Sequence, residues 1–446
     1  MSRIRPLIVM AVLLIVAAQG QQDSTSEALQ DQIEKLRGQL EGFQEMFAET
    51  NNAVETLKKL KFSGYVQSQF QSAQTAGIAS FAGGNFPSAT ATRFSVRRGR
   101  LKAQYTNDLT LSRFVLQIDV TQGGVGIKDA YVSVKDPWTR FIAVTAGIFD
   151  RPFGFEISYS SSSRENPERT RLFQTLFPGE RELGAKIEVL PSQMLFNGEW
   201  LSYFNLKAGF FNGTGSTTNE NDSRKDFIGR LGMEFPLADI NLAIDGGVSL
   251  YRGSARANSK KVYSVNDAMR EFVADSTASN LGNPYDRSYL GADVQVYYDL
   301  PVLGGISVRA EYIQGSQPST SADNKVYTSA TADLYRREFR GFYVNVIQNI
   351  GVDHQVVLRY DQFDPNTQVT GANIGATATA RLTEADIAYS TIGVGYIYHW
   401  DDNVKFVFYY DLVTNESVSI SAPPSLAPYK TDVNDNVLTF RTQFRF

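Results

Sequence analysis

Apolar and polar residues alternate along most of this chain, from residue 62 to the C-terminus. A period of two is typical of β-strands, whose successive side chains point to opposite faces. In the segment 403–413, Phe406, Phe408 and Tyr410 share one face. Lys405 and Asp411 share the other face. The alternation predicts about sixteen strands, at residues 62–72, 92–106, 110–121, 127–135, 139–149, 182–190, 200–211, 226–235, 240–251, 288–299, 305–315, 338–349, 354–363, 386–399, 403–413 and 435–446.

Strand length, aromatic placement and connection length favour a membrane as the surrounding medium. Several strands are close to the roughly nine to eleven residues that cross a bilayer at a tilt. Aromatic residues stand near the ends of apolar faces, where membrane interfaces favour them. Short turns alternate with long polar segments, as in outer-membrane barrels. The short turns include 107–108, 236–239, 300–304 and 351–352, and the long segments include 74–91, 212–225, 253–286, 316–337 and 365–384.

The predicted fold is an all-β transmembrane barrel of about sixteen antiparallel strands over residues 61–446. Lipid offers no hydrogen bonds, so every strand needs a partner on both sides and the last strand must pair with the first. The closing segment 437–446, VLTFRTQFRF, has an apolar face and a cationic face, as expected of a strand between lipid and a water-filled lumen. We expect the outer membrane of a Gram-negative bacterium.

A different period precedes the strands. Between residues 27 and 60, apolar residues recur in steps of four and three, which predicts a short coiled-coil helix. Glycines at 38 and 42 weaken the helix by about 1 kcal/mol each, so partner helices are needed, and the bulky Phe43 and Phe47 favour three strands. One amphipathic helix lying on its own domain is the alternative. We expect 21–60 to form a periplasmic stem. The repeating positions are Leu29, Ile33, Leu36, Leu40, Phe43, Phe47, Val54 and Leu57.

The first twenty residues have the pattern of a secretory signal peptide. Arg3 and Arg5 precede an apolar stretch at 7–18, and residues 18–20 form a small-x-small cleavage site. An uncleaved anchor is the alternative, but the apolar stretch is shorter than the roughly 20 residues of a spanning helix. We expect the mature chain to begin near Gln21.

Composition narrows the chemistry. The chain has no cysteine and two histidines, which is poor material for a metal site or a thiol nucleophile. The formal net charge of −4 does not favour nucleic acid, whose binding domains are basic. We expect no cofactor, no metal ion, no nucleic-acid partner and no enzymatic activity.

Four sequence segments resemble the phosphate-selective porin O and P family: 96–101 (VRRGRL), 127–132 (IKDAYV), 146–154 (AGIFDRPFG) and 181–184 (RELG). The resemblance implies a homotrimeric sixteen-stranded porin whose long third loop, near 150–180, folds into the lumen as a constriction. The aromatic Phe446 is similar to the terminal residue by which the barrel-assembly machinery recognises such proteins.

Basic residues are the candidates for an anion path. Alternation places Arg98, Arg100 and Lys102 on one face of one strand, and this face is expected to line the lumen. Guanidinium and ammonium groups there would replace part of an anion's hydration shell. Further candidates in or near the constriction loop and on the last strand are Arg151, Arg164, Arg169, Arg171, Arg181, Arg441 and Arg445.

Nearby carboxylates support an alternative, in which the same arginines only hold the loop in place. The loop region also contains Asp150, Glu156, Glu165, Glu168, Glu180 and Glu182, so its charges nearly cancel. The sequence therefore predicts a porin for small hydrophilic solutes in contact with outer-membrane lipid, and leaves open a preference for anions or phosphate. Two alternatives are a barrel that tethers the envelope through its stem, and a barrel hydrolase that uses a serine between 158 and 163.

Overall fold

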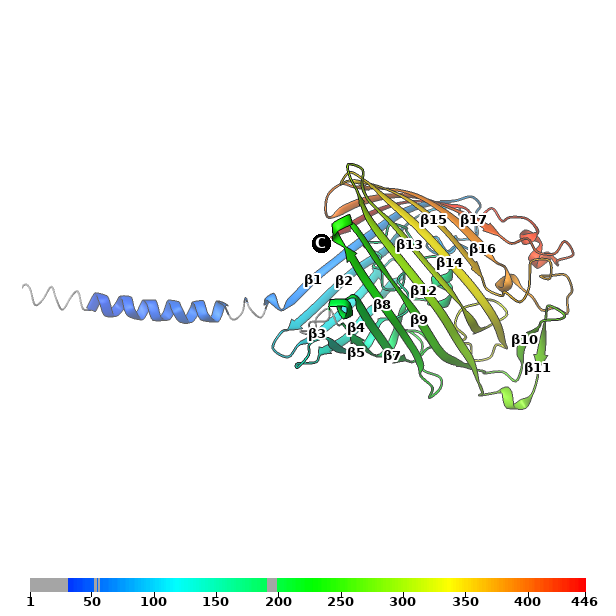
Figure 1. The fold of residues 1–446 in the computed structure, drawn as a ribbon, viewed down its shortest axis with the longest axis horizontal. Helices are drawn as coiled ribbons and strands as arrows, with labels where there is room; N and C mark the ends of the chain where they lie inside the picture. The colour runs from blue at the N-terminus through cyan, green and yellow to red at the C-terminus, as the bar shows by residue number, and fades with distance from the viewer. Residues whose placement is uncertain (1–30, 52–53, 55–56, 191–198) are drawn as a thin grey trace, which may run out of the picture. The chain divides into compact units, whose positions relative to one another are not determined.

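The computed structural model describes residues 31–51, 54, 57–190 and 199–446. The chain divides into two compact units, residues 1–61 and 62–446, and each is described by itself (Figure 1). The predicted signal peptide at 1–20 lies outside the described residues.

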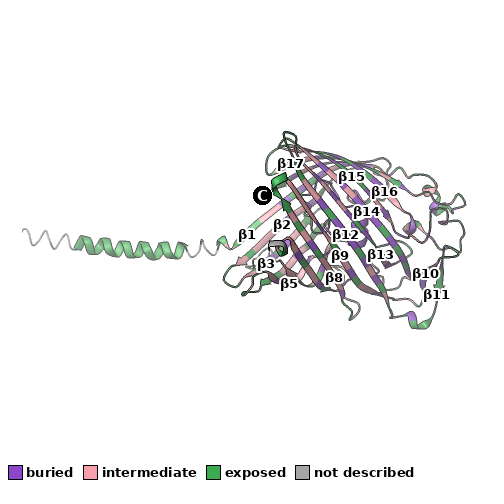
Figure 2. Cartoon of the chain, in the orientation of Figure 1, coloured by how far each residue is buried: buried purple, intermediate pink, exposed green. Residues whose placement is uncertain are grey.

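The first unit contains a helix over residues 31–51, with residues 54, 57 and 58 also helical. Its apolar stripe is uncovered, since Leu36, Phe43 and Phe47 are 62%, 62% and 66% exposed. Figure 2 shows the helix exposed along its described length. No helix in the described part of the chain has the length and apolar character needed to span a membrane.

The second unit is a closed antiparallel barrel, as predicted. Every predicted strand is present with small shifts at its ends. The barrel strands are β1 (Leu60–Ala73), β2 (Thr92–Asn107), β3 (Ser112–Thr121), β4 (Gly124–Lys135), β5 (Ile142–Asp150), β6 (Arg181–Val189), β7 (Phe204–Phe211), β8 (Asp226–Leu237), β9 (Leu242–Arg256), β12 (Pro284–Leu300), β13 (Gly304–Ser319), β14 (Leu334–Ile350), β15 (His354–Asp364), β16 (Tyr389–His399), β17 (Val404–Asn415) and β18 (Val437–Arg445).

Pairing of the first and last strands closes the barrel. β1 and β18 run antiparallel from Tyr65 opposite Arg445 to Ala73 opposite Val437. Gly64 and Phe446 also exchange two backbone hydrogen bonds, of 3.1 and 3.0 Å. The end of the chain therefore has a backbone partner, which confirms the prediction that the last strand pairs with the first.

Two short strands were not predicted. β10 (Val262–Asn266) and β11 (Glu271–Asp275) form a hairpin within the long connection between β9 and β12. The hairpin lies at the end of the barrel opposite the C-terminus (Figure 1). β10 also pairs in parallel with β14, where the rings of Tyr263 and Tyr335 stack with centroids 4.4 Å apart. Five residues give too few periods to distinguish a strand from a loop by alternation.

Side chains on the two faces of the barrel differ in exposure. On β17, residues alternate between buried and exposed or intermediate over most of the strand, and Figure 2 shows similar alternation along neighbouring strands. Outward residues are apolar and exposed in this single chain, including Phe408 and Tyr410. Inward residues are polar and buried, including Asp411 and Arg441. Polar residues are buried because the lumen is partly filled.

Candidate functional site: a charged constriction

The connection between β5 and β6, residues 151–180, fills much of the lumen and contains the short helix α2 (Arg171–Leu176). Its apolar side packs against inward aromatic residues of the opposite wall. Phe177 lies with its ring centroid 5.6 Å from that of Tyr289 on β12, and Phe173 lies 6.3 Å from Tyr343 on β14. The predicted constriction loop is therefore an inserted segment whose apolar side chains form one hydrophobic cluster with the barrel wall; the loop contributes Phe153, Ile157, Leu172, Phe173, Leu176 and Phe177.

The loop begins with a turn that requires glycine. Gly154 has a φ of 61°, and a Cβ there would stand 1.6 Å from Oε1 of Glu311. Glu311 on β13 accepts hydrogen bonds from the backbone N–H groups of Phe155 at 3.2 Å and Glu156 at 3.1 Å. The RPFG sequence thus brings the backbone against an inward carboxylate, a close approach that any side chain would block.

Glu168 joins the loop to three arginines of the barrel wall. Its carboxylate lies 2.9 Å from Arg97, 2.6 Å from Arg98 and 2.8 Å from Arg441. Burial alone would raise the pKa of Glu168, but the guanidinium groups of these arginines outweigh it and hold that pKa well below its usual range. The carboxylate therefore stays ionised at neutral pH. β2 and β18, which lie far apart in the sequence, meet at this side chain.

Glu180 forms a second junction, at the end of the loop. It pairs with Arg169 of the loop, with Lys128 of β4 and, at 3.5 Å, with Arg181 of β6. Arg181 also lies 2.8 Å from Asp129. Burial would raise the pKa of Glu180, whereas the charges of Arg169, Lys128 and Arg181 lower it well below its usual range. These basic residues hold the loop against the wall.

Other carboxylates of the loop region face different partners. Glu165 lies 2.9 Å from Arg309 on β13, and Glu182 lies 2.8 Å from Arg151. Glu156 accepts hydrogen bonds from the backbone N–H and the hydroxyl of Thr170, at 3.1 and 2.9 Å. In the sequence, the acidic residues of the loop region nearly cancel its positive charge. In the structure, they bind separate partners at several places along the loop.

A gap of about 310 Å³ remains between the loop and the wall formed by β2, β3 and β4. We call it the charged gap. Two aromatic rings, Phe173 and Phe177, form part of its loop side. Six basic and three acidic side chains line it: Arg97, Arg98, Arg100, Lys128, Arg169 and Lys325, with Asp119, Glu168 and Glu180. The gap is basic although the whole chain is acidic.

Arg97 is a lining residue that alternation does not identify. Strict alternation from Arg98 places it on the outer face of β2. Val96 and Leu101 are both exposed, although an odd number of steps separates them. The inward face therefore changes parity between them, and Arg97 and Arg98 both reach Glu168. In the sequence, the apolar residues Val96 and Leu101 stand five positions apart, and this odd spacing was the available signal.

The predicted site residues occupy different places. Arg98, Arg100 and Arg169 line the charged gap, and Arg100 lies 3.3 Å from Asp119. Lys102 is half-buried two residues further along β2. Arg164 donates to the backbone carbonyls of Asn166 and Pro167, both at 3.1 Å.

Three further candidates, Arg441, Arg171 and Arg445, are not among the residues that line the charged gap. Arg441 is buried against Glu168. Arg171 stacks against aromatic rings outside the gap. Arg445 is exposed near the C-terminus and donates to the carbonyl of Asp402 at 3.0 Å. Lys128 and Lys325 line the gap but were not candidates, and no local pattern distinguishes Lys325.

A closed sixteen-stranded barrel with an inserted loop and a charged gap defines a porin-type channel. The family model described as phosphate-selective porin O and P matches residues 82–446. The chain belongs to this family, and it is a porin of the bacterial outer membrane.

Solved structures of outer-membrane proteins share the fold at low sequence identity. The anion-selective porin from Comamonas acidovorans is 12% identical, with a TM-score of 0.52 over 87% of this chain and 99% of that chain. OprB from Pseudomonas putida is 11% identical, with a TM-score of 0.54 over 88% and 96%. The outer-membrane channel DcaP of Acinetobacter baumannii is 12% identical, with a TM-score of 0.50 over 87% and 97%. Among curated proteins, none matches the sequence.

Proposed function

We propose that this porin passes small hydrophilic solutes with a preference for anions. The observation that carries the proposal is the excess of basic side chains around the charged gap. Partial burial raises the effect of these charges, because the local dielectric constant is lower than in water. An anion entering the gap exchanges part of its hydration shell for guanidinium and ammonium groups.

The pairing of the arginines favours weak contacts. Arg97, Arg98 and Arg441 share Glu168, so part of their charge is already compensated. Weak attraction suits conduction, since a solute must leave the site as readily as it enters. We therefore propose transient anion contacts along this wall, with phosphate as one permeant anion among others.

The purified full-length protein in a planar bilayer tests this proposal. Under a potassium chloride gradient, we expect a reversal potential whose sign corresponds to chloride. A potential of the sign for potassium would overturn the anion preference, and absence of channels would overturn solute passage. Replacing chloride with phosphate on one side then measures the relative permeability of the two anions.

We also propose that three chains assemble through the N-terminal helix. The exposed stripe of Leu36, Phe43 and Phe47 has the spacing of a coiled-coil seam, and its size fits three helices. Residue 60, which follows the helix, begins β1 at the same end of the barrel as the short turns. Short turns face the periplasm in outer-membrane barrels, so we place the stem there, with Phe446 at the same end for recognition by the assembly machinery.

Replacing Leu36 and Phe43 with glutamine is expected to weaken the trimer, because it removes two apolar layers from the proposed seam. Semi-native electrophoresis across a temperature series would measure the temperature at which trimers dissociate. We expect a lower dissociation temperature than in the parent protein. Lys35→Gln, on the polar side of the same helix, is the matched control. An unchanged temperature in the double variant would remove the stem from the assembly.

The tethering alternative makes a different prediction for a chain lacking residues 27–60. Unchanged trimers together with a detached envelope would support a tether, and low conductance combined with such detachment would make tethering the primary role.

The hydrolase alternative has less support. Ser161 shares a 2.6 Å hydrogen bond with Tyr65, and Ser160 shares one of 2.9 Å with Ser162. The histidines bond elsewhere, His354 to Tyr396 at 2.8 Å and His399 to Gln355 at 3.1 Å.

A further inference from the structure

A cavity of about 550 Å³ lies beside the charged gap, among the long connections of the barrel. We call it the entrance pocket. Its volume is in the range of roughly 300–1,000 Å³ that small organic ligands occupy. Gln174 and Lys325 line both this pocket and the charged gap, so a molecule bound here is already next to the proposed anion path.

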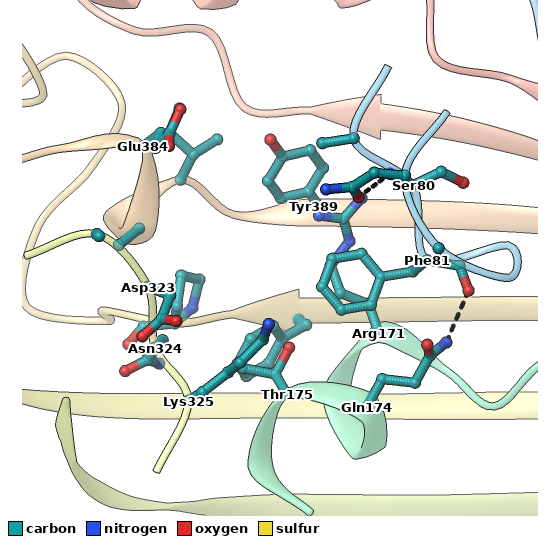
Figure 3. A pocket seen from close by; sticks show the side chains of 18 of the residues that line it. Ser80, Phe81, Arg171, Gln174, Thr175, Asp323, Asn324, Lys325, Glu384 and Tyr389 are labelled. Carbon is teal, nitrogen blue, oxygen red and sulfur yellow. Dashed lines mark hydrogen bonds between the residues drawn. The ribbon is translucent and has the colours of Figure 1, made fainter. Parts of the chain in front are cut away.

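Arg171 stacks against two aromatic rings at one side of the entrance pocket. Its guanidinium carbon lies 4.3 Å from the ring centroid of Phe81 and 3.6 Å from that of Tyr389. Figure 3 shows these three side chains together, with Phe81 fixed through the hydrogen bond from Gln174 to its carbonyl oxygen, 2.8 Å long. Stacking on two aromatic side chains fixes a planar guanidinium group while its edge remains available for an anion.

Among the described residues, Arg171 has no hydrogen-bond acceptor for its Nε. This nitrogen is buried, and no carboxylate among the same residues lies within ion-pair distance of Arg171. Arg98 and Arg441, in contrast, are paired with Glu168. A stacked cation with an unused Nε donor is suited to a carboxylate ligand.

The rest of the lining is apolar and neutral polar, with two carboxylates, Asp323 and Glu384, and one further cation, Lys325. Figure 3 shows Asp323 and Glu384 across the pocket from Phe81 and Arg171. Asp323 is near the hydroxyl of Thr320 at 3.3 Å, and Glu384 accepts from Tyr429 at 3.3 Å. A second anionic group at that side would be repelled. Apolar and aromatic surface is supplied by Phe81, Phe363, Pro365, Ile387, Tyr389 and Tyr429.

We propose that the entrance pocket binds aromatic monocarboxylates, with the carboxylate on Arg171 and the ring against the aromatic lining. Lys325, which lines both spaces, then attracts the bound anion toward the charged gap. The inference rests on the proposed anion preference and adds a class of substrate to it. It also explains why Arg171, unlike Arg98 and Arg441, has no carboxylate within ion-pair distance among the described residues, although Asp435 and Asp361 interact with it electrostatically from further away.

Single-channel recordings of the full-length protein in potassium chloride test the pocket, with benzoate added on the side of the long connections. We expect transient block, with a half-blocking concentration about tenfold lower for benzoate than for acetate, since ring contacts contribute on the order of a tenfold difference. Terephthalate, with a second carboxylate at the opposite end of the ring, should block less well than benzoate. Equal block by acetate and benzoate would overturn the proposal.

Variants separate the cation from the rings. Arg171→Gln should raise the half-blocking concentration of benzoate by about tenfold or more, as expected for loss of a charged hydrogen bond. Tyr389→Leu should weaken block, whereas Tyr389→Phe, which keeps the ring, should not. Lys430→Gln removes a charge from a neighbouring loop outside the pocket and is the matched control. Unchanged block in R171Q, or equal loss in K430Q, would overturn the assignment.

A second variant at Arg171 and the reversal potential complete the test. If R171Q does not form channels, Arg171→Lys keeps the charge without the planar donors and should still weaken benzoate block. Retained block in R171K together with retained block in Y389L would overturn the proposal. The reversal potential in potassium chloride distinguishes the two ideas. A chloride-selective channel without benzoate block contradicts only the entrance pocket, whereas a potassium-selective channel contradicts the anion preference itself.

Discussion

Replacing Arg98 and Arg100 with glutamine is expected to remove most of the channel's preference for chloride over potassium. Six basic and three acidic residues line the charged gap, so this double change leaves four and three. The excess of positive charge then falls to one. We expect the ratio of chloride to potassium permeability to fall about tenfold, which corresponds to about 1.4 kcal/mol, an amount that two partly screened charges can supply.

The reversal potential under a potassium chloride gradient measures this change. Arg445→Gln removes the same charge from an exposed position near the C-terminus, outside the lining of the gap, and should alter the ratio little. An unchanged potential in the double variant would exclude this wall from the permeation path. A shift of the same size in R445Q would show that the effect depends on total charge and not on position.

Replacing Glu168 with glutamine is expected to release the constriction loop. The change leaves Arg97, Arg98 and Arg441 close together without their shared carboxylate. Arg98, Arg441 and Glu168 are only 5%, 3% and 5% exposed. Removing one partner of such a buried ion pair costs about 3–5 kcal/mol. We expect a lower temperature of thermal unfolding, and larger open-channel noise with more frequent closures.

The ratio of chloride to potassium permeability is a second readout for this variant. Loss of stability alone would not increase it. Because E168Q removes a negative charge from the gap, the preference for chloride should increase, opposite to the effect at Arg98 and Arg100. Glu220→Gln is the control, since Glu220 lies in a loop and pairs at 2.9 Å with the exposed Lys225. Quiet channels with parent-like selectivity in E168Q would contradict the role of Glu168 as the shared anchor.

The barrel was predictable because its signal is local. Side chains of a strand alternate between faces at every residue, so β17 and β18 are visible in the sequence without knowledge of their neighbours. The short strands β10 and β11 were missed because five residues give too few periods of alternation, and the pairing of β10 with β14 joins residues about 70 positions apart. Arg97 was missed because the parity of β2 changes beside it, where it and Arg98 both bind Glu168.

The sequence by itself determined the barrel and its closing strand, and the family resemblance implied an inserted loop, whose many charges are visible in the sequence. Only the tertiary structure decided how those charges are distributed. Glu168 meets Arg98 across 70 residues and Arg441 across 273, and such contacts depend on barrel closure and on the path of the loop. Glu165 and Glu182 pair elsewhere, with Arg309 and Arg151. A loop region that is nearly neutral in sequence therefore borders a basic gap, because electrostatic potential depends on distance in space.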